Sequence, residues 1–387
     1  MTAPIITVEA GRHHRRWCPI EFRLPQPLAP GSYLLDSGDG ALLVAEALND
    51  GRILFVLPEL PAGESRIYRI ESGDAADTKA NVTLADSGGG LSISLHGELV
   101  TRYVYGDVPA RPYFYPVHAP GQIPVTRAYP MEQDAAGETR DHPHHRSLWI
   151  AHGEVNDADN WSEEPGHALT RHQEFGHITG GRVAGYFASR SLWTRACGEA
   201  LLTQSLAVTV WATGGDFRLL DFDIKLSATH GDVQFGDTKE GGILSVRVAS
   251  ALDVPRTGTI TNVYGGTNEA ETWGRAAHWC DYSGTNAGYP VGIAVMDHPH
   301  SFRYPTHWHV RNYGLMTANP FAYAAYTDGV KDGSHTLKSG ETLAFRYRVV
   351  LHVGSCSDAD VNGRYLDFVA PPKVLATPQS SLEQIRS

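Results

Sequence analysis

Histidines at high local density are the residues of this sequence best suited to chemistry. Residues 141–147 read Asp-His-Pro-His-His-Arg-Ser, and residues 297–303 read Asp-His-Pro-His-Ser-Phe-Arg. The charge of imidazole changes near neutral pH, and imidazole is also the commonest metal ligand. We expect these two clusters, far apart in the sequence, to form two walls of one site, which makes an enzyme the first hypothesis.

The first candidate segment is 141–152, which holds four histidines, one arginine and one tryptophan. Its proline biases the chain away from a helix, so the imidazoles are expected to fan outward from a turn. We assign proton transfer to His142 and His145. The expected substrate-binding residues of this segment are His144, Arg146, Trp149 and His152.

The second candidate segment is 307–311. Residues two apart on a strand share a face, so His307, His309 and Arg311 should project together with Trp308 behind them. Such a row is a good floor for an anionic or hydroxyl-rich ligand. We assign a catalytic role to His309 and binding roles to His307, Trp308 and Arg311, and the second Asp-His-Pro phrase adds His298 to the binding residues.

The third candidate is the glycine-flanked turn that contains Asp237, Lys239 and Glu240. Either carboxylate suits the role of general base, nucleophile or histidine orienter, and Lys239 is expected to bind substrate. Each segment alone is too sparse for catalysis, so we predict that all three line one pocket.

A metal site is the alternative use of the same imidazoles, because a His-x-His spacing also serves cupin-like metal barrels. The ligands of a divalent cation would then be His142, His144, His307 and His309. The positive charges of Arg146, Lys239 and Arg311 oppose a dication. We therefore expect no cofactor, with a divalent metal kept as the alternative.

The elements that must position these residues are strands. Short apolar runs end at Gly, Asp, Asn or Pro, and the chain holds 40 glycines and 23 prolines. Leu202–Ala212 and Phe217–Ala228 should form a β-hairpin. Alternation along its second strand predicts one core-facing set: Leu220, Phe222, Ile224 and Leu226. We predict an all-β protein built as a large antiparallel β-sandwich, with helix well below the average content.

The chain is expected to divide into three parts. Residues 1–90 look like a small N-terminal β module, and residues 91–370 look like the main sandwich that carries the site. Residues 371–387 begin with two prolines and look like an extended tail.

Charge and hydropathy exclude several classes of protein. The formal net charge of −11 argues against nucleic-acid binding, which requires a basic surface. The apolar runs are far shorter than the roughly 20 residues that span a membrane, and no signal peptide is visible at the N-terminus. We expect a cytoplasmic protein with a small carbohydrate as its partner and no membrane partner, and the sequence leaves homo-oligomerisation open.

Several long motifs resemble a bacterial family labelled PmoA-like, over roughly residues 95–355. They include Arg111-Pro-Tyr-Phe-Tyr-Pro-Val, Pro124-Val-Thr-Arg, Glu138-Thr-Arg-Asp-His-Pro-His-His-Arg-Ser-Leu-Trp, Phe235-Gly-Asp-Thr-Lys-Glu-Gly and Thr306-His-Trp-His-Val-Arg-Asn-Tyr-Gly-Leu. The resemblance implies carbohydrate catabolism and a galactose-mutarotase-like supersandwich, a fold that hosts mutarotases, polysaccharide lyases and glycoside hydrolases. A membrane-bound methane oxygenase, which the label suggests, does not fit a chain without a spanning segment.

The leading hypothesis is therefore an enzyme that cleaves a glycosidic or related C–O bond of a small glycoside, as a hydrolase or lyase. A histidine and a carboxylate would exchange protons with the substrate. The alternatives are a sugar mutarotase or epimerase, a metal-dependent enzyme, and a sugar-binding protein without catalysis.

Overall fold

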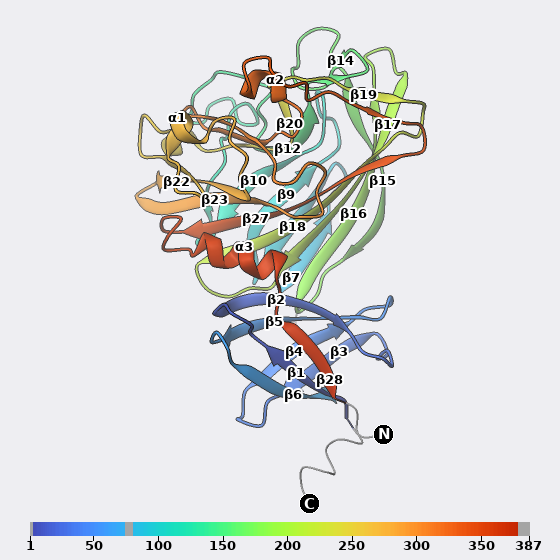
Figure 1. Cartoon of the computed structure of the whole chain (residues 1–387), viewed down its shortest axis with the longest axis vertical. Coiled ribbons are helices and arrows are strands. Elements are labelled where there is room, and N and C mark those ends of the chain that lie inside the picture. The colour runs from blue at the N-terminus through green and yellow to red at the C-terminus, as the bar shows by residue number, and fades with distance from the viewer. Residues whose placement is uncertain (1–2, 74–79, 378–387) are drawn as a thin grey trace, which may run out of the picture.

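The computed structural model describes residues 3–73 and 80–377. Strands make up 51% of the structure and helices 6%, and the large sheets are antiparallel, which confirms the predicted all-β sandwich. Figure 1 shows a smaller sheet at the lower end and a larger body above it.

The lower sheet combines the beginning and the end of the described chain. Its seven strands lie in the order β2 (Arg15–Arg23), β5 (Arg52–Leu60), β4 (Leu42–Ala47), β3 (Gly31–Asp36), β6 (Ser65–Ser72), β1 (Ile5–Glu9) and β28 (Lys373–Thr377). The first part of the predicted tail is thus a strand paired with β1, and residues 378–387 lie outside the described residues. This sheet has its own apolar cluster, which includes Ile6, Val8 and Phe55.

Two large sheets form the sandwich of the upper body. The order of the first is β24 (Trp308–Arg311), β25 (Leu315–Ala318), β20 (Gly241–Arg247), β12 (Leu148–His152), β10 (Tyr113–Ala119), β9 (Glu98–Val104), β8 (Gly90–Leu95) and β7 (Val82–Asp86), with β11 (Ile123–Pro124) beside β10. The order of the second is β15 (Leu169–Thr179), β16 (Ala184–Thr194), β17 (Ala200–Trp211), β18 (Phe217–Ser227), β27 (Thr342–Val353), β23 (Tyr289–Asp297), β22 (Trp279–Asn286) and β21 (Thr259–Asn262). We call them the nine-stranded and the eight-stranded sheet.

Smaller elements complete the upper body. A four-stranded sheet has the order β14 (Ala158–Asp159), β13 (Glu154–Val155), β19 (Val233–Phe235) and β26 (His335–Leu337). The helices are α1 (Asn268–Thr272), α2 (Tyr323–Tyr326), α3 (Val361–Val369) and a 3-10 turn at Ser250–Leu252. Among the described residues, the helices are all too short or too polar to cross a membrane.

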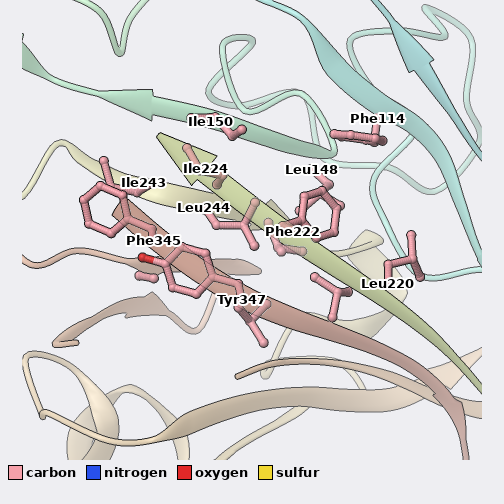
Figure 2. Close-up of a cluster of buried hydrophobic side chains, with 14 of the residues drawn as sticks. Phe114, Leu148, Ile150, Leu220, Phe222, Ile224, Ile243, Leu244, Phe345 and Tyr347 are labelled. Atoms are coloured by element: carbon pink, nitrogen blue, oxygen red, sulfur yellow. The ribbon is translucent and has the colours of Figure 1, made fainter. Parts of the chain in front are cut away.

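The core fills the space between the two large sheets (Figure 2). The predicted hairpin is present as β17 and β18. All four predicted core residues of β18, from Leu220 to Leu226, are at most 1% exposed, which confirms the predicted strand face. Phe222 contacts Phe114 of the opposite sheet with ring centroids 5.3 Å apart.

Helix α3 lies between the lower sheet and the eight-stranded sheet (Figure 1). The Asp360 carboxylate accepts the backbone N–H of Gly363 at 3.0 Å and caps the helix N-terminus. Farther along α3, Asp367 accepts a hydrogen bond at 3.0 Å from Arg15 of β2, and both side chains are buried. The helix therefore links the N-terminal sheet to the sandwich.

Candidate active site

The candidate site lies on the face of the nine-stranded sheet that points away from the core. Strand pairing sets a row across this face, with Trp149 opposite Ser245, Ser245 opposite Thr317, and Thr317 opposite His309. Leu148, one position along β12 from Trp149, points into the core instead. The row joins the first predicted segment to the strand that carries the second.

The two loops that carry the first and third predicted segments reach this face from opposite ends of the strands. Loop 141–147 precedes β12 and turn 237–240 precedes β20, and these two strands are antiparallel. Burial lowers the pKa of His144 to about 4, and the negative charge of Glu240 acts against that shift. Burial also raises the pKa of Tyr313, and the charge of Glu240 adds to this rise. The charge of Glu240 therefore acts both on His144 of the first segment and on Tyr313.

An ionised carboxylate orients His142. The distance between Asp141 Oδ2 and His142 Nδ1 is 2.5 Å, and Arg127 and Arg247 donate to Asp141 Oδ1 at 2.7 and 2.8 Å. Burial alone would raise the pKa of Asp141, but the hydrogen bond with His142 and the two guanidinium groups hold it far below its usual range. The anion fixes a proton on Nδ1 of His142, which leaves Nε2 for a ligand.

A stack of four rings holds this imidazole in place. The centroids of Tyr313 and His142 are 5.0 Å apart, those of His142 and His145 4.8 Å, and those of His145 and Trp149 5.4 Å. His142 also has a φ of 43°, in the left-handed region that non-glycine residues seldom adopt. Strained backbone of this kind persists where the surroundings enforce it, and it is common at functional sites.

His145, which we predicted to transfer protons, is placed as a support. Its side chain is buried, and its Nδ1 accepts a hydrogen bond at 3.2 Å from Arg247. Burial, followed by the charges of His144 and Arg247, holds the pKa of His145 well below its usual range. Its ring is therefore neutral, and it packs between the rings of His142 and Trp149.

The two predicted carboxylates of the third segment have different surroundings. Asp237 Oδ2 accepts the backbone N–H groups of Ala324 and Gly333 at 2.8 and 2.5 Å, so this carboxylate anchors loops. Glu240 is exposed and accepts a hydrogen bond at 2.6 Å from Lys239. Glu240 is the one of the pair that a ligand can reach.

The second segment contributes a buried imidazole and a paired arginine. Trp273 Nε1 donates to His309 Nδ1 at 3.0 Å. Burial, with the charges of Arg311 and Lys239, lowers the pKa of His309 to about 3, so its ring is neutral. Arg311 donates at 2.6 Å to Glu269 of α1.

Loop 160–164 adds a carboxylate beside the first segment. Arg146 forms a two-point contact with Glu163, at 2.6 Å for both N–H···O distances. Trp161 of the same loop lies 5.4 Å from Trp149 and 6.0 Å from His144, measured between ring centroids. The loop therefore covers the end of the row that begins at Trp149.

Two predicted binding residues belong to the packing of the body. Trp308 is in the core between the sheets, and its indole donates to the carbonyl of Ala277 at 2.9 Å. It cannot touch a ligand on the opposite face. His152 is fully buried, donates to the carbonyl of Gly236 at 3.0 Å, and has a pKa lowered to about 4 by burial.

Two further histidines lie apart from the Asp141–His142 pair. His298 packs on Phe368 of α3, with ring centroids 4.9 Å apart, beside the eight-stranded sheet. The second Asp-His-Pro phrase therefore does not form a second wall. The His307 ring stacks on Tyr326 of α2 at 5.5 Å, at the border of the site.

Sequence reasoning missed the residues that position His142, namely Arg127, Arg247 and Tyr313. Arg127 ends the Pro124-Val-Thr-Arg motif but has no role assigned from it, and Arg247 lies in no such motif; each reaches Asp141 from a different strand or loop. The position of Tyr313 could have been expected, because it lies two residues after Arg311, the last residue of the His-x-His-x-Arg row.

The metal alternative does not fit the arrangement of the histidines. Within residues 3–73 and 80–377, no three His, Cys, Asp or Glu side chains converge as metal ligands. His142 contacts Asp141 and Tyr313, whereas His307 contacts Tyr326, so these two expected ligands have different neighbours.

The chain matches a number of solved structures, among them two at low identity. A protein in the glycosyl hydrolase family 38 from Enterococcus faecalis aligns with 98% of this chain at 8% identity and a TM-score of 0.46, and this chain spans about half (48%) of its length. A GalM/aldose epimerase homologue from C. elegans aligns with 70% of this chain and 99% of its own, at 10% identity and a TM-score of 0.25. Neither structure is similar enough to indicate an activity. No curated protein matches the sequence.

The family is shown by a match that covers most of the chain. Residues 90–365 match the model of DUF6807, a family of unknown function, so the chain belongs to DUF6807. This finding corrects the expected PmoA-like membership.

Proposed function

We propose that this member of DUF6807 is a carbohydrate-active enzyme that cleaves a glycosidic or related C–O bond of a small glycoside. In this proposal His142 transfers the proton and Glu240 is the partner carboxylate. The observation that carries it is the Asp141–His142 pair, with its 2.5 Å hydrogen bond and an exposed imidazole.

The surroundings of His142 suit a proton carrier. The Asp141 carboxylate fixes the tautomer and stabilises the imidazolium that forms when Nε2 takes a proton, as in other carboxylate–histidine pairs. Tyr313 and His145 hold the two faces of the ring. In its imidazolium form, His142 can therefore give the Nε2 proton to the leaving oxygen without losing its orientation.

Glu240 supplies the second group that acid–base cleavage requires. One group protonates the leaving oxygen while the other takes a proton from the attacking water or from the substrate. Glu240 comes from the other end of the strands and acts electrostatically on Tyr313 and His144, next to His142. The charge of Glu240 thus reaches the ring of Tyr313, which stacks on His142.

Aromatic side chains support a sugar as the ligand. The rings of Tyr113, Tyr313 and Trp273 are half-buried on or beside this face. Half-buried rings of this kind offer flat apolar surface next to polar groups, which suits the alternating C–H and O–H faces of a pyranose. Trp149 itself is buried under the ring of His145, so it packs against that ring and does not contact a ligand.

The test is activity on a panel of glycosides, measured as release of reducing sugar. We expect His142→Gln and Glu240→Gln each to lower turnover at least about 10²-fold, because positioned proton transfer contributes about 10²–10⁴-fold. His230→Gln and Glu199→Gln are the matched controls, since both residues are exposed on other loops. Turnover that survives in both site variants, or a wild-type protein that cleaves no member of the panel, would refute the proposal.

A further inference from the structure

Five cations of the candidate site have carboxylate partners within the protein. Arg146 pairs with Glu163, Arg311 with Glu269, Lys239 with Glu240, and both Arg127 and Arg247 with Asp141. We infer that the site takes uncharged polyhydroxylated ligands, and that Glu163 is the side chain that excludes acidic sugars. The inference rests on the proposed function and adds the class of substrate.

The Arg146–Glu163 pair is the most complete of these contacts. Both N–H···O distances are 2.6 Å, and the side chains are 12% and 13% exposed. A two-point contact occupies the guanidinium edge that would otherwise bind the carboxylate of a uronic acid or the oxygens of a phosphate. An acidic ligand would have to displace Glu163 from a contact that is largely shielded from water.

Glu163 also balances a second guanidinium. Arg111 is buried, and burial lowers its pKa to about 10, while the charges of Glu163 and Asp159 oppose that shift. Arg111 Nη2 donates to the carbonyl of Ser162 at 3.1 Å, and its Nε and Nη1 have no partner among the described residues. Removing the charge of Glu163 would therefore leave two guanidinium groups with surplus positive charge at one end of the site.

The loop that carries Glu163 has other supports. Asp159 Oδ1 accepts the backbone N–H groups of Trp161 and Ser162 at 2.8 and 2.9 Å. Trp161 is buried against Trp149 and His145. Glu163→Gln keeps the size of the side chain and these contacts, so it changes charge with little effect on the loop.

The neighbouring residue provides a matched control. Glu164 is exposed, and no ion pair joins it to the described residues. Glu164→Gln changes the net charge of the protein by the same amount as Glu163→Gln. A difference between the two variants therefore reports the local charge beside Arg146 and Arg111.

The experiment measures binding of the full chain to a glycan array with matched neutral and uronic acid oligosaccharides, such as galacto-oligosaccharides and oligogalacturonides. We expect wild type and Glu164→Gln to bind only neutral members. Glu163→Gln should gain at least about tenfold in affinity for uronic members, because hydrogen bonds to charged partners are the stronger ones. Adding Arg146→Gln to Glu163→Gln should remove the gain.

Each other outcome is decisive. Wild-type preference for uronic or phosphorylated members would overturn the inference and leave the proposed function standing. Absence of a gain in Glu163→Gln, with an unchanged melting temperature, would overturn the role of Glu163. Binding to no glycan at all would overturn the proposed function and this inference with it. The wild-type comparison needs no variant, so it decides the substrate class even if Glu163→Gln fails to fold.

Discussion

At the scale of single residues, the environment of a histidine decides its role more than its place in a motif. His142 and His145 are three residues apart in the sequence. His142 is exposed beside the Asp141 carboxylate, whereas His145 is buried and accepts a hydrogen bond from Arg247. The sequence could place both near a turn but could not distinguish them. The carboxylate and the arginines that make the difference meet only in the folded chain.

Asp297, the first residue of the second Asp-His-Pro phrase, offers a test of buried charge. It is fully buried, and burial raises its pKa to about 7, against about 3.9 in an unfolded chain. Its protonated form therefore adds stability below pH 4, and this contribution is lost as the pH rises through 7. We expect the stability of Asp297→Asn relative to wild type to rise by about 2–4 kcal/mol between pH 5 and pH 9.

Urea unfolding of both proteins at pH 5 and pH 9 measures this effect. Asp328→Asn is the control, because Asp328 is exposed at a position with a φ of 50°, which asparagine tolerates. A stability difference between Asp297→Asn and wild type that stays the same at pH 5 and pH 9 would contradict the expected charge state.

At the scale of elements, strand periodicity carried most of the information in the sequence. The alternation in β18 correctly separates its core face from its other face, and His309 and Arg311 correctly lie opposite the core-facing Val310. The same alternation places Trp308 in the core, so its assignment to ligand binding conflicted with the strand face. Loops were harder, because no periodicity says that residues 141–147 fold over the row from Trp149 to His309.

Phe222 of β18 tests the packing between the two large sheets. It is fully buried and contacts Phe114 across the sandwich. Phe222→Ala should lower the free energy of unfolding by about 3–5 kcal/mol, as a large-to-small change in a core does. Lys225→Ala, at an exposed position of the same strand, should stay within about 0.5 kcal/mol of wild type. Urea denaturation gives both values, and a Phe222→Ala cost below that of Lys225→Ala would contradict the packing.

At the scale of the whole molecule, the pairing of β28 with β1 was beyond the reach of the sequence. Ile5 and Thr377 are partners in this ladder, and a five-residue strand so far from its partner leaves no local signal. The compositional division into a module, a sandwich and a tail does not anticipate that the end of the chain completes the first sheet. Pairing of distant segments depends on the surface that the rest of the fold leaves open.

Two shortened chains test the contribution of β28. A chain that ends at Pro372 lacks the strand, whereas a chain that ends at Thr377 retains it. We expect the shorter chain to lose protection from proteolysis between residues 5 and 72, because β1 becomes an unpaired edge and part of the cluster around Val8 is uncovered. Limited proteolysis with mass spectrometry locates the cuts. Equal resistance of the two chains would show that β28 is dispensable.

The strand exchange between the two ends of the chain also has a consequence for biosynthesis. Domains of most proteins fold in the order in which they leave the ribosome, N-terminal parts first. Here the first sheet to be translated is completed by residues 373–377, which follow the strands of the sandwich in the sequence, since β28 is the partner of β1. Until β28 is translated and paired, the N-terminal sheet has an open edge beside β1, and an open edge of this kind can pair with other chains. The lower sheet is therefore completed only after the strands of the sandwich, up to β27, have been translated.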